Sequence, residues 1–270
     1  FAFLTHLIHP NQNSMTTKHR IQSTLNRIEA AHGVHVLFAV ESGSRAWGFA
    51  SRDSDYDVRF IYAHSPEWYL SVEQHRDVIE VPVSDDLDVI GWDLRKALKL
   101  LRKSNPSVLE WIKSPEVYRA DPEFALLFGL LASDFYSNDT LFRHYLSMAR
   151  GNFRDSLKSD HVCLKKYLYI LRPLLACRWI ERGLGPVPMP FKTLTDTVVE
   201  DANLRFHIAV LVARKRAGEE LDRGPRIPII HNFIESELDR LERIAPVPTQ
   251  MPGAEKLDQF FREFCLPTAA

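Results

Sequence analysis

The sequence has few cysteines, and the three that are present, Cys163, Cys177 and Cys265, do not lie at metal-binding spacings. Their odd number suits a reducing compartment. No run of 18 apolar residues occurs, so no membrane span is expected. The N-terminal segment FAFLTHLIHP lacks the charged region and the long apolar core of a signal peptide. These absences favour a cytoplasmic protein.

An excess of charge of either sign is also lacking. The chain has 34 Lys and Arg against 35 Asp and Glu, so no overall basic field indicates a nucleic-acid partner. None of the eleven histidines shows zinc spacing, and none accompanies a nucleophile as a catalytic triad requires. Zinc and triad-hydrolase chemistry are therefore poor interpretations. With 270 residues, 45% of them hydrophobic, the chain has the composition of a globular protein of one large or two modest domains.

Residues 40–62, VESGSRAWGFASRDSDYDVRFIY, carry the strongest functional signal. Gly43-Ser44 follows an apolar run, and the backbone N–H groups of such a strand-to-helix turn bind phosphates. Asp55 and Asp57 open a second apolar run. Because side chains alternate across a strand, the two carboxylates point to the same face and can share hard cations. A phosphate cradle beside a carboxylate pair indicates phosphoryl or nucleotidyl transfer.

Each half of this pattern also has an ordinary explanation. A Gly-Ser pair is a common turn, and an Asp-x-Asp is usually a solvated strand edge or loop. The two together, at this spacing and between two apolar strands, favour a metal site.

The pattern resembles the signature of the DNA polymerase β-type nucleotidyltransferase superfamily, in which a Gly-Ser precedes an Asp-x-Asp by about ten residues. The superfamily has a third carboxylate on a nearby strand, for which Asp88 in DDLDVIGWDL is the best match, with Asp85 and Asp86 as rivals. Ser42 departs from the pattern, because an apolar residue usually stands at that position. Together with KKYLYILRPLLACRWIERG, these motifs resemble the RNA-repair-associated, YcgL-like family of bacterial nucleotidyltransferases, over roughly residues 30 to 245.

The order of predicted elements favours an α+β fold, in which a small mixed β-sheet of polymerase β type is followed by helices. The nucleotidyltransferase catalytic domain is predicted at 16–114 and a helical domain that binds nucleotide and acceptor at 115–270. Residues 1–15 are assigned to an extension, because Met15 is a candidate start. Apolar patterns predict strands at 34–41, 56–63, 78–83 and 87–92. They predict helices at 16–33, just after Ser44, and at 94–102, 122–132, 138–158, 161–183, 204–217 and 230–244, with a short closing helix.

Basic residues gather in the predicted helical domain. Residues 141–182 contain nine Lys or Arg against three acidic residues. Lys165, Tyr169 and Arg172 recur at helical spacing and predict a face that holds the triphosphate and stacks on the base or sugar. A solvated cationic flank is the alternative.

A second basic stripe is predicted on the preceding helix. Arg150, Arg154 and Lys158 recur every four residues, and we expect them to bind RNA in a salt-sensitive manner.

The resemblance implies that a nucleoside monophosphate passes from an NTP to an acceptor hydroxyl, with release of pyrophosphate. Two magnesium ions, which manganese can replace, are implied as cofactors. The catalytic metal ligands so implied are Asp55, Asp57 and Asp88. The predicted nucleotide-binding residues are Gly43, Ser44, Arg45, Lys165, Tyr169 and Arg172, and Arg52 is a further candidate.

The family association favours an RNA end as the acceptor. A small molecule stays open as an acceptor, and so does a protein hydroxyl, as in an AMPylating transferase of a toxin–antitoxin or defence system. A non-catalytic nucleic-acid-binding protein on the same fold is the other alternative, although such a protein is expected to lack one of the metal carboxylates.

Overall fold

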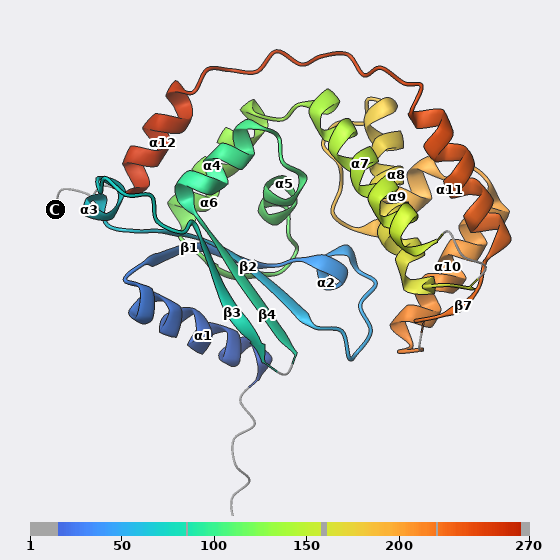
Figure 1. Ribbon diagram of the computed structural model, residues 1–270, viewed down its shortest axis with the longest axis horizontal. Helices are drawn as coiled ribbons and strands as arrows, with labels where there is room; N and C mark the ends of the chain where they lie inside the picture. Colours follow the sequence, from blue (N-terminus) through green and yellow to red (C-terminus); the bar gives the residue numbers. More distant parts are fainter. Residues whose placement is uncertain (1–15, 85, 158–160, 220, 266–270) are drawn as a thin grey trace, which may run out of the picture.

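The computed structural model describes residues 16–84, 86–157, 161–219 and 221–265. Figure 1 shows a twisted β-sheet with helices on both faces, and beside it a second body built of helices. A long connection runs over the top of the molecule and brings the last helix back to the sheet. The predicted α+β fold with a small mixed sheet is confirmed.

The sheet has five strands in the order β3-β4-β2-β1-β5. β2 and β4 pair in parallel, whereas the other neighbouring strands pair antiparallel. The strands are β1 (His35–Glu41), β2 (Tyr56–Ala63), β3 (Val78–Ser84), β4 (Leu87–Asp93) and β5 (Val117–Ala120). The first four lie where the apolar pattern predicts them. The fifth is not predicted, because four residues are too few for an alternating pattern to stand out.

Helices cover both faces of the sheet. α1 (Thr17–His32) begins after the N-cap Thr16 and ends at Gly33, whose φ of 60° favours glycine. The apolar side of α1 packs on the face that carries Val58 and Phe60. The opposite face lies under α4 (Leu94–Arg102), α5 (Pro106–Ile112) and α6 (Pro122–Asp134). Two short helices, α2 (Gly43–Trp47) and α3 (Pro66–Tyr69), lie within connections.

The helical body surrounds α8, which is buried along most of its length. Leu164, Leu168, Leu171 and Leu175 form the predicted core-facing stripe, and all four are buried. The helices of this body are α7 (Asn138–Ser156), α8 (Leu164–Glu181), α9 (Phe191–Val198), α10 (Ala202–Arg216) and α11 (Pro228–Leu241). A short ladder of β6 (His161–Val162) and β7 (Gly224–Pro225) closes one end.

The end of the chain rejoins the sheet body. α12 (Glu255–Cys265) packs against α4 and α6, where the ring centroid of Phe260 lies 5.5 Å from that of Phe124. β5, α6 and α12 thus all belong to the sheet body, although they lie within the region predicted as the helical domain. Residue 115 therefore separates strand-rich from helix-rich sequence rather than two packing units.

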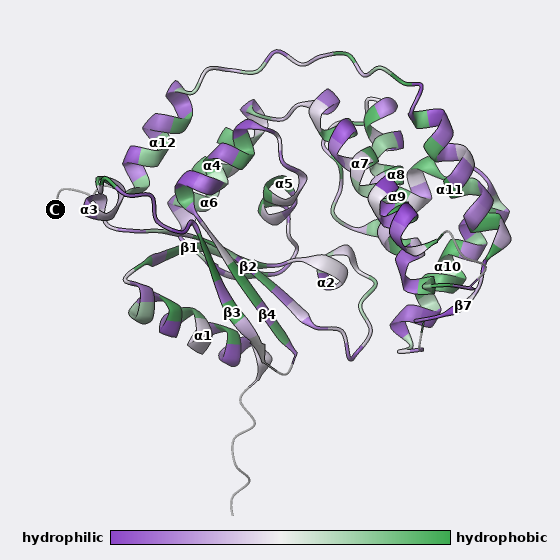
Figure 2. Ribbon diagram, in the orientation of Figure 1, coloured by the Kyte–Doolittle hydropathy of each residue, from purple (hydrophilic) through white to green (hydrophobic). Residues whose placement is uncertain are grey.

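The hydropathy of the elements explains this packing. Figure 2 shows the strands as largely hydrophobic, whereas many helices have one hydrophilic and one hydrophobic side. Over the described ranges, no helix combines the length and the hydrophobicity that crossing a membrane demands.

Candidate active site

The site begins where two parallel strands place two carboxylates side by side. Asp57 of β2 lies in register with Asp88 of β4. Their neighbours Val58 and Val89 belong to the core under α1. Because side chains alternate along a strand, both aspartates point to the face opposite α1. Both side chains are a little over a quarter exposed.

Arg59 joins these two carboxylates. It stands two residues after Asp57 and therefore on the same face of β2. Its Nη2 donates to Oδ1 of Asp57 at 3.0 Å and to Oδ2 of Asp88 at 2.8 Å. No functional role for Arg59 is predicted from the sequence, although its even spacing from Asp57 is a signal that it belongs to the same face.

The Gly43-Ser44 turn lies against Asp57. Gly43 has a φ of 59°, and a Cβ added there would collide with Oδ2 of Asp57 and lie 2.9 Å from its Cγ. The turn therefore needs glycine both for its backbone conformation and for this close approach. Ser44 is buried in the first turn of α2. The predicted phosphate-binding turn and the carboxylate of Asp57 are thus in direct contact.

The loop before β2 is held by Arg45. Its Nε donates to the backbone oxygen of Asp55 at 3.2 Å, and its Nη2 donates to that of Arg52 at 3.4 Å. The guanidinium also lies 3.7 Å from the ring centroid of Tyr56. Arg45 therefore positions the exposed Asp55 next to Asp57, and Arg52 itself points to solvent.

Glu41 is a site residue that the sequence prediction lacks. It is buried at the end of β1, where Oε1 accepts the backbone N–H of Asp57 at 2.8 Å and Oε2 accepts the hydroxyl of Tyr118. Burial raises the pKa of Glu41, and the two hydrogen bonds oppose that shift. A glutamate that ends an otherwise apolar strand directly before the turn was the available signal.

The carboxylates concentrate negative charge in a partly buried place. Burial raises the pKa of Asp57; the positive charge of Arg59 opposes the shift, while the charges of Asp88 and Asp55 add to it. Carboxylate oxygens are the donors that magnesium and manganese prefer, so the chemistry of the three side chains fits a hard divalent cation. Within the described residues, however, no three His, Cys, Asp or Glu side chains converge as metal ligands. Arg59 instead takes one oxygen of Asp57 and one of Asp88.

Of the rival third carboxylates, Asp88 is the one beside Asp57. Asp86 pairs with Arg20 of α1 at 2.9 Å, and its backbone oxygen accepts the N–H of Tyr56. Asp85 lies outside the described residues.

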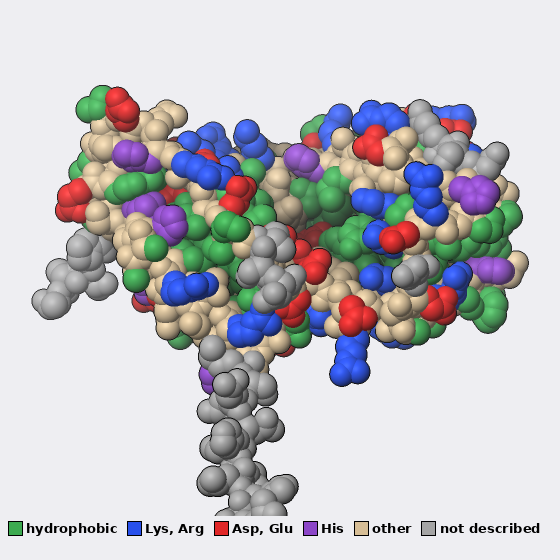
Figure 3. All heavy atoms as spheres, turned by 60° about the horizontal axis from the view of Figure 1, so that its bottom comes forward, with side chains coloured by type: hydrophobic (Ala, Val, Ile, Leu, Met, Phe, Trp, Pro, Cys, Tyr) green, Lys and Arg blue, Asp and Glu red, His purple; other side chains and the backbone are tan. Residues whose placement is uncertain are grey.

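A cleft separates the sheet body from the helical body. Figure 3 shows the molecule hollowed between its two bodies, with acidic and apolar side chains in the hollow and Lys and Arg side chains on the helical rim. Tyr169 of α8 packs edge-on against Trp47 and Phe49. Burial raises the pKa of Tyr169, and the charges of Asp57 and Asp55 contribute to the shift. Tyr169 therefore lies within electrostatic range of the carboxylates, as the predicted nucleotide-binding face requires.

Lys165 lies one helical turn before Tyr169. Its Nζ donates to Oδ1 of Asp222 at 2.7 Å, and this hydrogen bond raises the pKa of Lys165. The side chain of Lys165 is 44% exposed and therefore accessible to solvent. Lys165 and Tyr169 thus keep the neighbouring positions predicted from their spacing.

Two further cations reach the same region from the end of α10. Nζ of Lys215 lies 3.4 Å from Oγ of Ser51, and Nε of Arg216 donates to the backbone oxygen of Gly48 at 3.0 Å. Neither residue is predicted as a site residue. The basic run at 214–216 was a signal, but its proximity to the Gly-Ser turn depends on how the two bodies pack.

Arg172 does not have the predicted role in this structure. It is 2% exposed, and its Nη1 donates to Oε1 of Glu110 at 2.7 Å. The same glutamate accepts hydrogen bonds from the hydroxyl of Tyr145 and from Nε1–H of Trp47. Arg172 therefore joins the two bodies internally, because an arginine buried this deeply needs a charged partner.

The basic character of residues 141–182 is also largely compensated. Arg150 pairs with Glu242 at 2.6 Å, and Arg178 and Arg182 pair with glutamates outside this range. Arg154 pairs with its neighbour Asp155. Lys158, the third member of the predicted RNA-binding stripe, lies outside the described residues. The local excess of positive charge is thus reduced by acidic residues from other parts of the chain.

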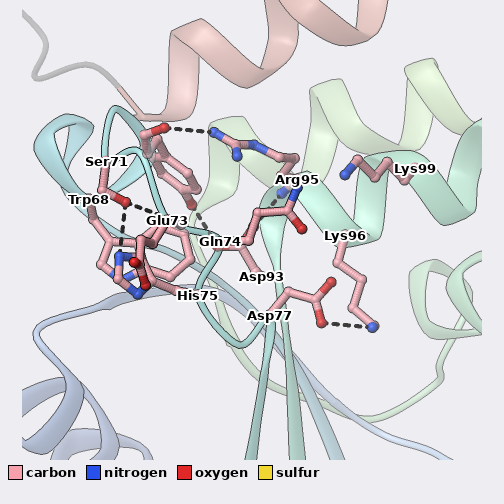
Figure 4. A pocket seen from close by; sticks show the side chains of 11 residues that line it. Trp68, Ser71, Glu73, Gln74, His75, Asp77, Asp93, Arg95, Lys96 and Lys99 are labelled. Carbon is pink, nitrogen blue, oxygen red and sulfur yellow. Dashed lines mark hydrogen bonds and ion pairs between the residues drawn. The ribbon is translucent and has the colours of Figure 1, made fainter.

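A second hollow, of about 120 Å³, lies at the other end of β4, next to α3 and α4. Figure 4 shows Lys96 paired with Asp77 there, and the hydroxyl of Tyr69 donates to the buried Asp93 at 2.8 Å. These polar groups form hydrogen bonds and ion pairs with one another. The hollow lies at the opposite end of β4 from Asp88.

The mixed sheet, the Gly-Ser turn before an Asp-x-Asp, and a third aspartate on the neighbouring strand form the pattern that is typical of polymerase β-like nucleotidyltransferases. Residues 17–263 match the family described as RNA repair pathway DNA polymerase beta family, RlaP. The chain belongs to this family, and the resemblance predicted from the sequence is confirmed.

One curated protein and one solved structure are similar to this chain. The uncharacterized protein YcgL of Bacillus subtilis is 49% identical over 228 residues, which are 84% of this chain and 88% of that protein. The crystal structure of a nucleotidyltransferase-like protein from Exiguobacterium sibiricum is similar with a TM-score of 0.34 and 12% identity, over 90% of this chain and 80% of that one.

Proposed function

We propose that the protein is a metal-dependent nucleotidyltransferase that moves a nucleoside monophosphate from an NTP to the hydroxyl at an RNA end. The observation that carries this proposal is the contact between the Gly43 turn and Asp57, with Asp88 in register beside it. The turn lets the backbone approach a phosphate closely, and the carboxylates can hold the metal ions that accompany a triphosphate. These two groups are therefore neighbours.

The side chains divide the reaction among them. Asp55, Asp57 and Asp88 would hold two magnesium ions, or manganese in their place, which supply positive charge for the triphosphate. The amides of the Gly43-Ser44 turn bind the β and γ phosphates. The acceptor oxygen bonds to the α phosphorus as the bond from that phosphorus to the β-phosphate oxygen breaks, and pyrophosphate leaves. Asp88 would also accept the proton of the acceptor hydroxyl.

The family description supports RNA as the acceptor, because it places this family in an RNA repair pathway. The test is to incubate the protein with each labelled NTP and magnesium, in the presence of total RNA, of cell protein or of small-molecule extract. Label should enter RNA, and the labelling should fall as salt rises, because RNA phosphates release counter-ions when they are bound. Label in protein would instead identify a protein-modifying transferase. If no acceptor takes up label from any NTP, the proposal is contradicted.

Removal of the Lys165 side chain should weaken NTP binding. A charge-assisted hydrogen bond contributes roughly 1.5–3 kcal/mol, so Lys165→Ala is expected to raise the Kd for a nonhydrolysable NTP by about tenfold or more in isothermal titration. Asp222→Asn should leave that affinity unchanged or strengthen it, because Asp222 competes with phosphate for Lys165.

Arg150→Ala is the matched control, since Arg150 is similarly exposed but pairs with Glu242 away from the turn. Equal NTP affinities in the Lys165→Ala and Arg150→Ala variants would show that Lys165 is only a solvated lysine.

A further inference from the structure

Arg59 is the most firmly held cation at the site. Its Nη2 binds one oxygen of Asp57 and one of Asp88, at 3.0 and 2.8 Å. Its Nη1 donates to the backbone oxygens of Val58 and Asp88, at 3.1 and 2.9 Å. The side chain is 16% exposed. Two of these four bonds are to main-chain oxygens of the paired strands β2 and β4.

This arrangement assigns different partners to the two oxygens of each carboxylate. Oδ1 of Asp57 faces Arg59, whereas Oδ2 lies against Gly43 and so faces the turn. Likewise, Oδ2 of Asp88 is taken by Arg59, which leaves Oδ1. A carboxylate has lone pairs for several partners, so each aspartate can bind Arg59 and a further cation at the same time.

Arg59 also acts electrostatically on any ion that approaches. Its positive charge neutralises part of the charge of Asp55, Asp57 and Asp88, and it repels a second cation at short range, where the protein screens poorly. A triphosphate adds negative charge to the same place and offsets that repulsion.

We propose that Arg59 is a positioning residue that serves as a resident counter-ion of the site. It holds Asp57 and Asp88 in register, and it keeps their affinity for a free divalent cation low until the triphosphate arrives. This inference rests on the proposed nucleotidyltransferase function and explains how the carboxylates of Asp57 and Asp88 remain side by side.

The test is to titrate the free protein with Mn²⁺ and to follow unbound Mn²⁺ by electron paramagnetic resonance. Arg59→Gln should bind Mn²⁺ about tenfold more tightly than the wild type, because a nearby positive charge is lost and two carboxylate oxygens are released. Arg59→Lys should change the affinity less, in the same direction, because it keeps the charge but loses the two-armed geometry.

Arg119→Gln is the matched control. Arg119 is also largely buried, at 22% exposed, and it pairs with Glu29 of α1 on the other face of the sheet. Its replacement should leave Mn²⁺ binding unchanged. Thermal unfolding in chelator and in excess Mn²⁺ gives a second readout: the ion should stabilise Arg59→Gln more than it stabilises the wild type.

Equal or weaker Mn²⁺ binding by the Arg59 variants would mean that Arg59 only orders the carboxylates, and would overturn the proposal. If Arg59→Gln fails to fold, Arg59→Lys decides between the two outcomes. A wild type that binds no Mn²⁺ even with a nonhydrolysable NTP would instead remove the proposed function itself. The two failures are therefore distinguishable.

Discussion

Replacing Asp57 by asparagine is expected to reduce nucleotidyl transfer on the order of a thousandfold or more, while the protein still folds. Asparagine keeps the shape of the side chain and can still accept a hydrogen bond from Arg59, but it loses the charge that holds a divalent cation. Because Asp57 is only partly buried, it contributes little to packing. Asp55→Ala should have a similar effect. Transfer of labelled nucleotide and thermal unfolding are the two measurements.

Asp77→Asn is the matched control, because Asp77 also forms an ion pair, with Lys96, but at the far end of the sheet. It should retain full activity. Asp88→Asn should be nearly as damaging as Asp57→Asn, whereas Asp86→Asn should be mild because Asp86 pairs with α1. An Asp86 variant that is worse than the Asp88 variant would show that the third metal ligand is wrongly assigned, and full activity of Asp57→Asn would eliminate the site.

Gly43→Ala and the bulkier Gly43→Val are both expected to abolish detectable NTP binding. An added Cβ would collide with Oδ2 of Asp57, so either the turn or the carboxylate must move. The φ of 59° also costs a non-glycine residue about 1–2 kcal/mol. Isothermal titration with a nonhydrolysable NTP measures the loss of binding, and thermal unfolding measures the loss of stability.

Gly33→Ala separates these two effects. Gly33 has nearly the same φ, 60°, but a Cβ there meets nothing within 4 Å. Both variants should therefore lose similar stability from backbone strain, while only Gly43→Ala should lose NTP binding. If both bind NTP as the wild type does, the Gly43 turn merely connects β1 to α2.

The sequence by itself determined the local parts of the site. The strands that carry Asp57 and Asp88 were predicted, because an alternating apolar pattern depends only on neighbouring residues. The left-handed turn at Gly43 and the caps of α1 and α4 follow from residue types with strong local preferences. The apolar neighbours Leu87 and Val89 favoured Asp88 as the third carboxylate, and strand alternation set Asp85 on the opposite face from Asp88.

The tertiary structure decided which charges act at the site. Arg172 has the spacing of a phosphate-binding residue, yet it is buried against Glu110, which is 62 residues away in the chain. Lys215 carries no motif, yet it reaches Ser51 of the loop that precedes Asp55. Helical periodicity predicts which side chains share a face, but not what that face meets. Burial and ion pairing depend on segments that are distant in sequence. Only the folded chain therefore shows which basic side chains lie near the Gly43 turn and which are buried in internal ion pairs.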